Sequence, residues 1–229
     1  MGVPKRSLRR FTLASILRNY DRVLTHPRLS VRWSTTADAD MILACSPSEI
    51  VLATGARPYE PELSLSGIEV IQAWDVLAGH AVRERVVVAD WGRDSTGLDC
   101  AELLAERGHD VTLAIGSIYP GELLHQYHRN AYIGRLSRAG VRIDHYLGLE
   151  GADEGAIRFR NVCAPELKTT IPAETLVLCA GRVPNSDLGD DLRRRGARLR
   201  EAGDCRSPRG LEEAILEGTL ALHHDAAVE

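Results

Sequence analysis

Residues 85–115 read RVVVADWGRDSTGLDCAELLAERGHDVTLAI, and the fold class can be inferred from this stretch. Residues 86–89 form an apolar run that does not alternate with polar residues, as is typical of a strand buried on both faces of a parallel sheet. Apolar residues recur at helical spacing over 98–107, and a second strand follows at 110–115. Strand, helix and strand within about 30 residues form a βαβ unit, which predicts an α/β protein with a parallel sheet.

The turn inside this unit departs from the dinucleotide fingerprint G-x-G-x-x-G. Gly92, Asp94 and Gly97 stand at its three glycine positions, so the second glycine is missing. Asp94 adds a side chain and a negative charge where the backbone must approach a pyrophosphate, and like charges at 4 Å repel by about 1 to 4 kcal/mol. Gly116 and Ser117 stand about 20 residues further on, where an acid should hold the ribose. We therefore expect NAD(P) to bind weakly or not at all.

A second pattern occurs twice. Residues 51–58 read VLATGARP and residues 177–184 read VLCAGRVP, so each copy is a buried strand, a glycine and a proline. Glycine lets the backbone turn sharply, and proline prevents the strand from continuing. The βαβ unit lies between the copies, which indicates one domain inserted between two halves of another. We interpret Gly55 and Gly181 either as positions of close approach to a cofactor or as hinges between domains.

This order of motifs resembles the carboxyl-terminal part of the NADH:flavin oxidoreductases of the trimethylamine dehydrogenase and 2,4-dienoyl-CoA reductase type. The resemblance covers the chain from about Leu29 onward. It is carried by ATGARP at 53–58, AWDVL at 73–77, AELLAERGH at 101–109, AGDC at 202–205 and LEEAI at 211–215.

The resemblance implies an α/β fold of two Rossmann-like, three-layer domains with parallel sheets. The first domain, residues 1–80 and 182–229, is of the FAD type and incomplete. The second, residues 81–181, is of the NAD(P) type and is inserted into the first. Members of this family also carry a flavin-bearing barrel, a cysteine-bound cluster and a glycine-rich segment before the first Ala-Thr-Gly turn, where here only Gly2 is found. We therefore expect a partner chain that supplies the barrel or the glycine-rich segment.

A cofactor site follows from the same resemblance, and its cofactor is FAD, or ADP at the same position. Asp204 would accept hydrogen bonds from ribitol hydroxyls, while backbone N–H groups at the start of a helix near Leu211 face the flavin or its phosphates. The alternative is an ordinary Gly-Asp turn pair. Glu217 is expected to face solvent with Glu212 and Glu213. The candidate cofactor-binding residues are Ala53, Thr54, Gly55, Gly92, Gly97, Gly181, Gly203 and Asp204.

Composition excludes several other classes of protein. The formal net charge of −4 argues against a general nucleic-acid binder, which needs an excess of Lys and Arg over a whole face. The absence of a long apolar stretch argues against a membrane span, and we expect a cytoplasmic protein. Five scattered cysteines without a C-x-x-C pair give no indication of a metal site. The basic run 193–195 is expected to be solvated surface.

The remaining elements follow from periodicity. Helices are predicted at 7–24, 37–45, 123–138 and 211–223, and strands at 29–33, 50–53, 141–145, 156–162, 168–171, 176–179 and 197–201. No Ser, His and Asp set and no pair of acids indicates a hydrolase, and flavin chemistry needs no catalytic side chain beyond orientation and electrostatics. Two functions stay open: a component of a flavin-dependent oxidoreductase, and a non-catalytic nucleotide-binding or docking module.

Overall fold

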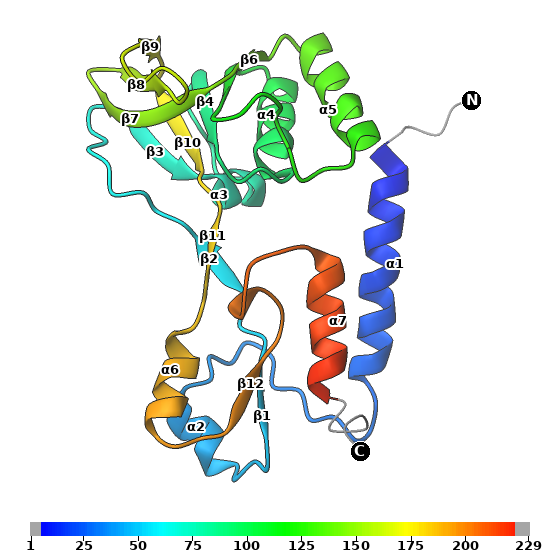
Figure 1. The fold of residues 1–229 in the computed structure, drawn as a ribbon. Coiled ribbons are helices and arrows are strands. Elements are labelled where there is room, and N and C mark those ends of the chain that lie inside the picture. Colours follow the sequence, from blue (N-terminus) through cyan, green and yellow to red (C-terminus); the bar gives the residue numbers. More distant parts are fainter. Residues whose placement is uncertain (1–5, 223–229) are drawn as a thin grey trace. The chain divides into compact units, whose positions relative to one another are not determined.

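The computed structural model describes residues 6–222, and the chain divides into two compact units, 1–48 and 49–229 (Figure 1). The first unit holds α1 (Arg6–Leu24) and α2 (Ala39–Ala44). Asp38 begins α2, because its carboxylate accepts the N–H of Met41 at 2.8 Å. The strand predicted at 29–33 is wrong: no strand forms there, and Trp33 is 71% exposed. Alternating apolar residues form a strand only where a partner strand lies alongside.

The second unit is built around a five-stranded parallel sheet in the order β3, β10, β4, β5, β6. These strands are β3 (Glu69–Gln72), β10 (Thr175–Cys179), β4 (Arg85–Asp90), β5 (Asp110–Ile115) and β6 (Arg142–Asp144). In Figure 1 the yellow β10 lies between the cyan β3 and the green β4, although it follows them by many residues. The predicted βαβ unit is confirmed as β4, α4 (Thr96–Glu106) and β5.

Three layers result because successive residues of a strand point to opposite faces of the sheet. Val86 and Val88 of β4 pack towards the helices, whereas Val87 and Ala89 pack towards the other face. The helical layer consists of α3 (Ala73–Ala78), α4 and α5 (Gln126–Arg138). The opposite layer is an antiparallel sheet of β7 (Leu147–Asp153), β8 (Ala156–Asn161) and β9 (Lys168–Pro172), whose Phe159 is fully buried. We call β3 to β10 with these layers the inserted domain.

The rest of the second unit is a smaller set of elements that precede β3 or follow β10 in the chain. β1 (Ile50–Leu52) pairs in parallel with β12 (Leu199–Glu201), and β2 (Ala56–Pro58) pairs antiparallel with β11 (Arg182–Pro184). The two copies of the repeated motif thus meet through β2 and β11, which we call the connector. The set is completed by α6 (Asp187–Arg194), the 3₁₀ turn η1 (Gly203–Cys205) and α7 (Leu211–Leu222).

Two features of this arrangement were not predicted from the sequence. Residues 69–80 were assigned to the first domain, but β3 hydrogen-bonds with β10 inside the sheet of the inserted domain. The basic run 193–195 ends helix α6, where Arg193 pairs with Asp190 at 3.1 Å and with Glu201 at 2.7 Å. These ion pairs show that the run is not only solvated surface.

Strand β4 ends in a buried carboxyl group, just before the turn to α4. Asp90 is 4% exposed, and its Oδ1 accepts the N–H of Gly92 at 2.9 Å. Burial raises the pKa of Asp90 to about 7. A Cβ on Gly97 would lie 2.5 Å from both Cγ and Oδ2 of Asp90, so the first turn of α4 fits against this carboxyl group only as glycine.

Replacing Gly97 by alanine therefore destabilises the fold. We expect Gly97→Ala to lower the free energy of unfolding by about 1–3 kcal/mol, because the added methyl must displace a buried side chain. Urea unfolding followed by circular dichroism measures the change. Gly134→Ala in α5 is the matched control, since its Cβ meets only the flexible end of Arg138, and it should stabilise by up to about 1 kcal/mol. Equal effects of the two substitutions would contradict the packing argument.

Asp90 also predicts a pH dependence. Its pKa is about 7 in the folded chain against a model-peptide value of 3.8, so its contribution to stability is complete below pH 3.8 and lost as the pH rises through 7. Asp90→Asn removes this loss, and its stability relative to the unchanged chain should rise between pH 5 and pH 8 by on the order of a few kcal/mol. Thermal unfolding at both pH values tests this, with Asp110→Asn as the exposed control. A difference that does not depend on pH would refute it.

Candidate cofactor site

A cavity of about 440 Å³ lies beside the turn that follows β1. Its wall is formed by Ala53 and Gly55 after β1, by Gly203 and Asp204 in η1, and by Leu211 and Gly218 on α7. The volume falls within the range of about 300–1,000 Å³ that is usual for small-molecule sites. Four of the eight candidate residues, Ala53, Gly55, Gly203 and Asp204, are thus brought to one cavity from two separate parts of the chain.

The backbone around Gly55 explains why the chain turns here. Gly55 has φ of 73°, a left-handed conformation that favours glycine, and its carbonyl accepts the N–H of Asn185 at 3.0 Å. Thr54 does not line the cavity, because its hydroxyl donates to the Asn185 carbonyl at 2.7 Å. Thr54 therefore holds the turn after β1 against the end of the connector.

Asp204 is partly buried, and both of its oxygens already accept hydrogen bonds. Oδ2 receives Nη1 of Arg182 at 2.7 Å, and Oδ1 receives the backbone N–H of Arg209 at 3.1 Å. The side chain keeps 22% of its exposure and lines the cavity. A carboxylate has about four lone-pair positions, so room for a ligand hydroxyl remains.

Glu217 corrects the expectation that this residue faces solvent. It is 9% exposed, and its Oε2 accepts the N–H of Gly203 at 2.8 Å while Oε1 meets Arg206 at 3.1 Å and also Arg209. Hydrogen bonds from Arg209 and from the Gly203 backbone lower the pKa of Glu217. This carboxylate therefore fixes α7 to η1 and positions the wall of the cavity.

The turn between β4 and α4 forms a second, much smaller site. Gly92 and Gly181 line a cavity of only about 10 Å³, which holds no more than a water molecule. The carboxylate of Asp94 accepts the N–H of Thr96 at 2.8 Å, and its other oxygen lies 3.5 Å from Nη2 of Arg182. Asp94 thus takes a backbone donor at the start of α4 that a phosphate would otherwise use. We call the turn between β4 and α4 closed when Asp94 occupies this donor.

Side chains near this turn fill the remaining space. Arg93 has φ of 63°, which is rare for a residue with a side chain, and it pairs with Glu122 at 2.6 Å. The indole of Trp91 donates to the Leu147 carbonyl at 3.2 Å and would lie 2.7 Å from a Cβ on Gly116. The space beyond the end of β5 is therefore occupied by an aromatic ring.

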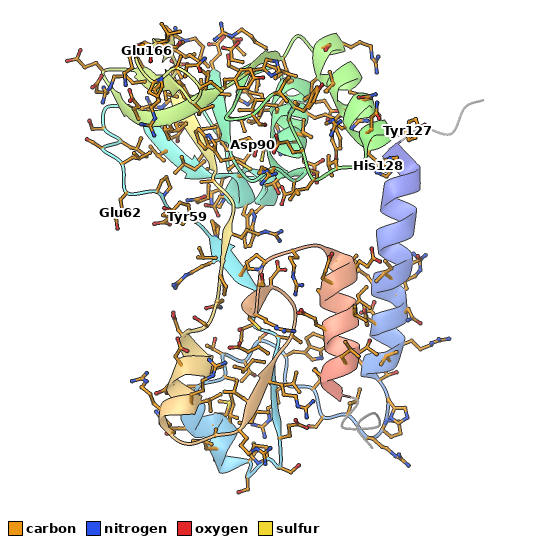
Figure 2. The ribbon with its side chains drawn as sticks, in the orientation of Figure 1. Tyr59, Glu62, Asp90, Tyr127, His128 and Glu166 are labelled. Atoms are coloured by element: carbon orange, nitrogen blue, oxygen red, sulfur yellow. The ribbon has the colours of Figure 1, made fainter. Side chains whose placement is uncertain are left out.

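Burial also determines the state of two thiols and of Asp90, which is labelled in Figure 2. Burial raises the pKa of Cys100 to about 12, and it raises the pKa of Cys179 further. Both groups therefore stay protonated at neutral pH and are poor nucleophiles.

Sequence reasoning missed four residues that hold these sites together: Asp90, Arg182, Arg209 and Glu217. Two of them have a recognisable signal. Asp90 is a charged residue directly after an apolar run, and Arg182 is charged where the first copy of the repeated motif has Ala56. Arg209 and Glu217 carry no such signal, because each is an ordinary polar residue until η1 and α7 come together.

No helix in the described stretch, residues 6–222, is both long and apolar enough to cross a membrane.

Comparison with known proteins agrees with this architecture. A bilirubin reductase of Mediterraneibacter gnavus is 30% identical over 198 residues, which cover 84% of this chain and 30% of that protein. An NADH oxidase of Thermoanaerobacter brockii is 42% identical over 96 residues, or 39% of this chain and 14% of that protein. The chain thus spans less than a third of the length of these two relatives.

Among solved structures, histamine dehydrogenase from Rhizobium sp. 4-9 superimposes with a TM-score of 0.84 at 19% identity, covering 93% of this chain and 36% of that one. A 2-naphthoyl-CoA reductase superimposes with a TM-score of 0.80 at 22% identity, covering 91% and 31%. These structures share the Rossmann-type fold. The sequence pattern of one family matches residues 28–206, most of the chain, and the chain accordingly belongs to the pyridine nucleotide-disulphide oxidoreductase family.

Proposed function

We propose that this chain is the nucleotide-binding part of a flavin-dependent oxidoreductase of the trimethylamine dehydrogenase and dienoyl-CoA reductase type. The observation that carries the proposal is the cavity of about 440 Å³ that joins Gly55, Asp204 and the start of α7. Its ligand is FAD, or ADP in the same position. Family membership supports FAD or NAD(P) binding in general, and the cavity supports the choice of site.

The chemistry of the cavity wall fits a nucleotide. Gly210 and Leu211 bring the start of α7 to the wall. The Gly210 N–H donates to Oε2 of Glu213 at 3.0 Å, and the first N–H groups of the helix itself, which lack acceptors within it, would attract phosphate. Arg182 and Arg209 also line the cavity, and Asp204 offers an acceptor to ribose or ribitol hydroxyls. The smaller apolar residues Ala53 and Ala214 leave room for a ring.

The flavin would supply the redox chemistry, and this chain would supply binding and orientation. None of the described side chains lining the cavity needs to act as an acid, a base or a nucleophile for that role. The substrate of the whole enzyme would be selected elsewhere, and methylated amines and enoyl thioesters both remain candidates.

We further propose that a partner polypeptide supplies the glycine-rich segment, and with it a flavin-bearing barrel. In the described part of the chain β1 pairs with β12 alone, and Val51 on this strand is 37% exposed. A two-stranded parallel sheet with an open edge is a typical position for a further strand to add. We also propose a cytoplasmic location, which the five free cysteines support because free thiols are usual in a reducing compartment.

The second candidate is a non-catalytic nucleotide-binding or docking module. The closed turn around Asp94 favours it, because a chain that binds no NAD(P)H does not receive hydride from that source. A yellow complex with a partner chain would decide for the oxidoreductase, whereas adenine nucleotide without flavin would decide for the module.

ADP binding tests the cavity directly. We expect calorimetry to give a dissociation constant below about 1 mM for the intact chain, which corresponds to roughly 4 kcal/mol of binding free energy. Gly218→Leu fills the cavity from α7, where a Cβ meets nothing within 4 Å, and should weaken ADP at least tenfold. Gly134→Ala, outside the cavity, should leave the affinity unchanged. Failure of ADP to bind, or equal binding by Gly218→Leu, would refute the site.

NADH binding tests the closed turn. We expect no binding to the unchanged chain below about 1 mM, and a gain of at least tenfold for Asp94→Gly, which restores the second glycine and removes a like charge. Intrinsic fluorescence of NADH measures both. Submillimolar binding to the unchanged chain that Asp94→Gly does not strengthen would show that the turn is competent as it stands.

A further inference from the structure

Arg182 stands between the two nucleotide sites and contacts both. Its Nη1 donates to Oδ2 of Asp204 at 2.7 Å, while Nη2 donates to the Arg209 carbonyl at 2.9 Å and lies 3.5 Å from Oδ2 of Asp94. The guanidinium lines the cofactor cavity as well as the small cavity beside Gly92. It reaches both because it opens β11, directly after the sharp turn at Gly181, whose φ is 91°.

Two carboxylates share this one cation. In the part of the chain that the structure describes, no other guanidinium lies within ion-pair distance of Asp94 or Asp204. Arg93, in the same turn as Asp94, is directed to Glu122 instead. The contact to Asp204 is short and the contact to Asp94 is long, so the cation favours the cofactor cavity as long as the Asp204 charge is not otherwise compensated.

The position of Asp94 decides whether the turn is closed. Its Oδ1 accepts the N–H of Thr96 at the start of α4, and its Oδ2 faces Arg182. Without Arg182, a negative charge would stand in this turn close to the buried Asp90, and Asp94 would be drawn towards solvent. The ion pair therefore holds Asp94 on the donor that a pyrophosphate would need.

We propose that Arg182 is a shared counter-ion through which the cofactor cavity controls the turn between β4 and α4. When a polyol hydroxyl occupies Asp204, Arg182 shifts towards Asp94 and holds the turn closed more tightly. Occupation of the first nucleotide site then disfavours a dinucleotide at the second. The coupling rests on the proposed function for its ligand, but the competition of Asp94 and Asp204 for Arg182 is a property of the chain alone.

Amide hydrogen exchange, followed by NMR on the full chain without ligand, tests that competition. Asp204→Asn keeps an acceptor for the Arg209 N–H and removes the charge, so exchange at the Thr96 amide should slow by roughly two- to fivefold, as expected for a partly exposed ion pair. Arg182→Gln should speed it by a similar factor. Arg57→Gln removes an exposed ion pair between the connector and Asp187, and it should leave exchange at the Thr96 amide unchanged.

The effect must also be reciprocal, since coupling between two sites acts equally in both directions. Asp94→Asn should slow exchange at the Arg209 amide, which donates to Asp204. Amides of the buried strand β5 report global unfolding and should be unchanged in every variant used for the comparison. Unchanged or faster exchange at Thr96 in Asp204→Asn, or at Arg209 in Asp94→Asn, would overturn the shared counter-ion.

Saturating FAD then tests the link to the cofactor. We expect it to slow Thr96 exchange in the unchanged chain and not in Arg182→Gln. A chain that binds FAD without this slowing overturns the coupling. A chain that binds neither FAD nor ADP contradicts the proposed function, and the two reciprocal variants still decide the competition for Arg182.

Discussion

Everything in the second unit depends on where β10 pairs. This strand is buried at every position and hydrogen-bonds with β3 on one side and β4 on the other. After the chain has left the sheet at β6 and formed β7 to β9, β10 thus returns to a place between the two earliest strands of the sheet. Because β11 follows β10 directly, the register of β10 in the sheet determines where Gly181 turns the chain and where Arg182 lies. A shift of β10 by one residue would exchange the two faces of the strand and separate Arg182 from both carboxylates.

The fold could be predicted where a continuous apolar run marks a buried strand, and less well where a strand depends on a partner strand distant in the sequence. The runs at 86–89 and 176–179 gave buried strands because they are apolar without alternation, and both are present. The segment 29–33 has the alternation of a strand and forms none, since a strand needs a neighbour that its own residues do not provide. The assignment of 69–80 failed to foresee β3 for the same reason: its partner, β10, is distant in the sequence.

The candidate site likewise contains residues that the sequence indicates and residues that it does not. Glycines with a positive φ, such as Gly55 and Gly181, are visible as turn residues after a strand. The charges that organise the site are not, because an ion pair between Arg182 and Asp204 exists only after η1 and β11 have been brought together. Glu217 shows the limit most clearly: its helix pattern favours solvent, and a buried backbone N–H and two arginines make its burial favourable instead.

A single aromatic side chain gives the closed turn a built-in optical signal. Trp91 packs its indole against Gly116 with its N–H bonded to the backbone, whereas Trp33 and Trp74 are 71% and 39% exposed. Emission from the sheltered ring lies at shorter wavelength than emission from the two wetted rings. The short-wavelength part of the protein's tryptophan emission consequently reports on the conformation of the turn between β4 and α4, with no added label.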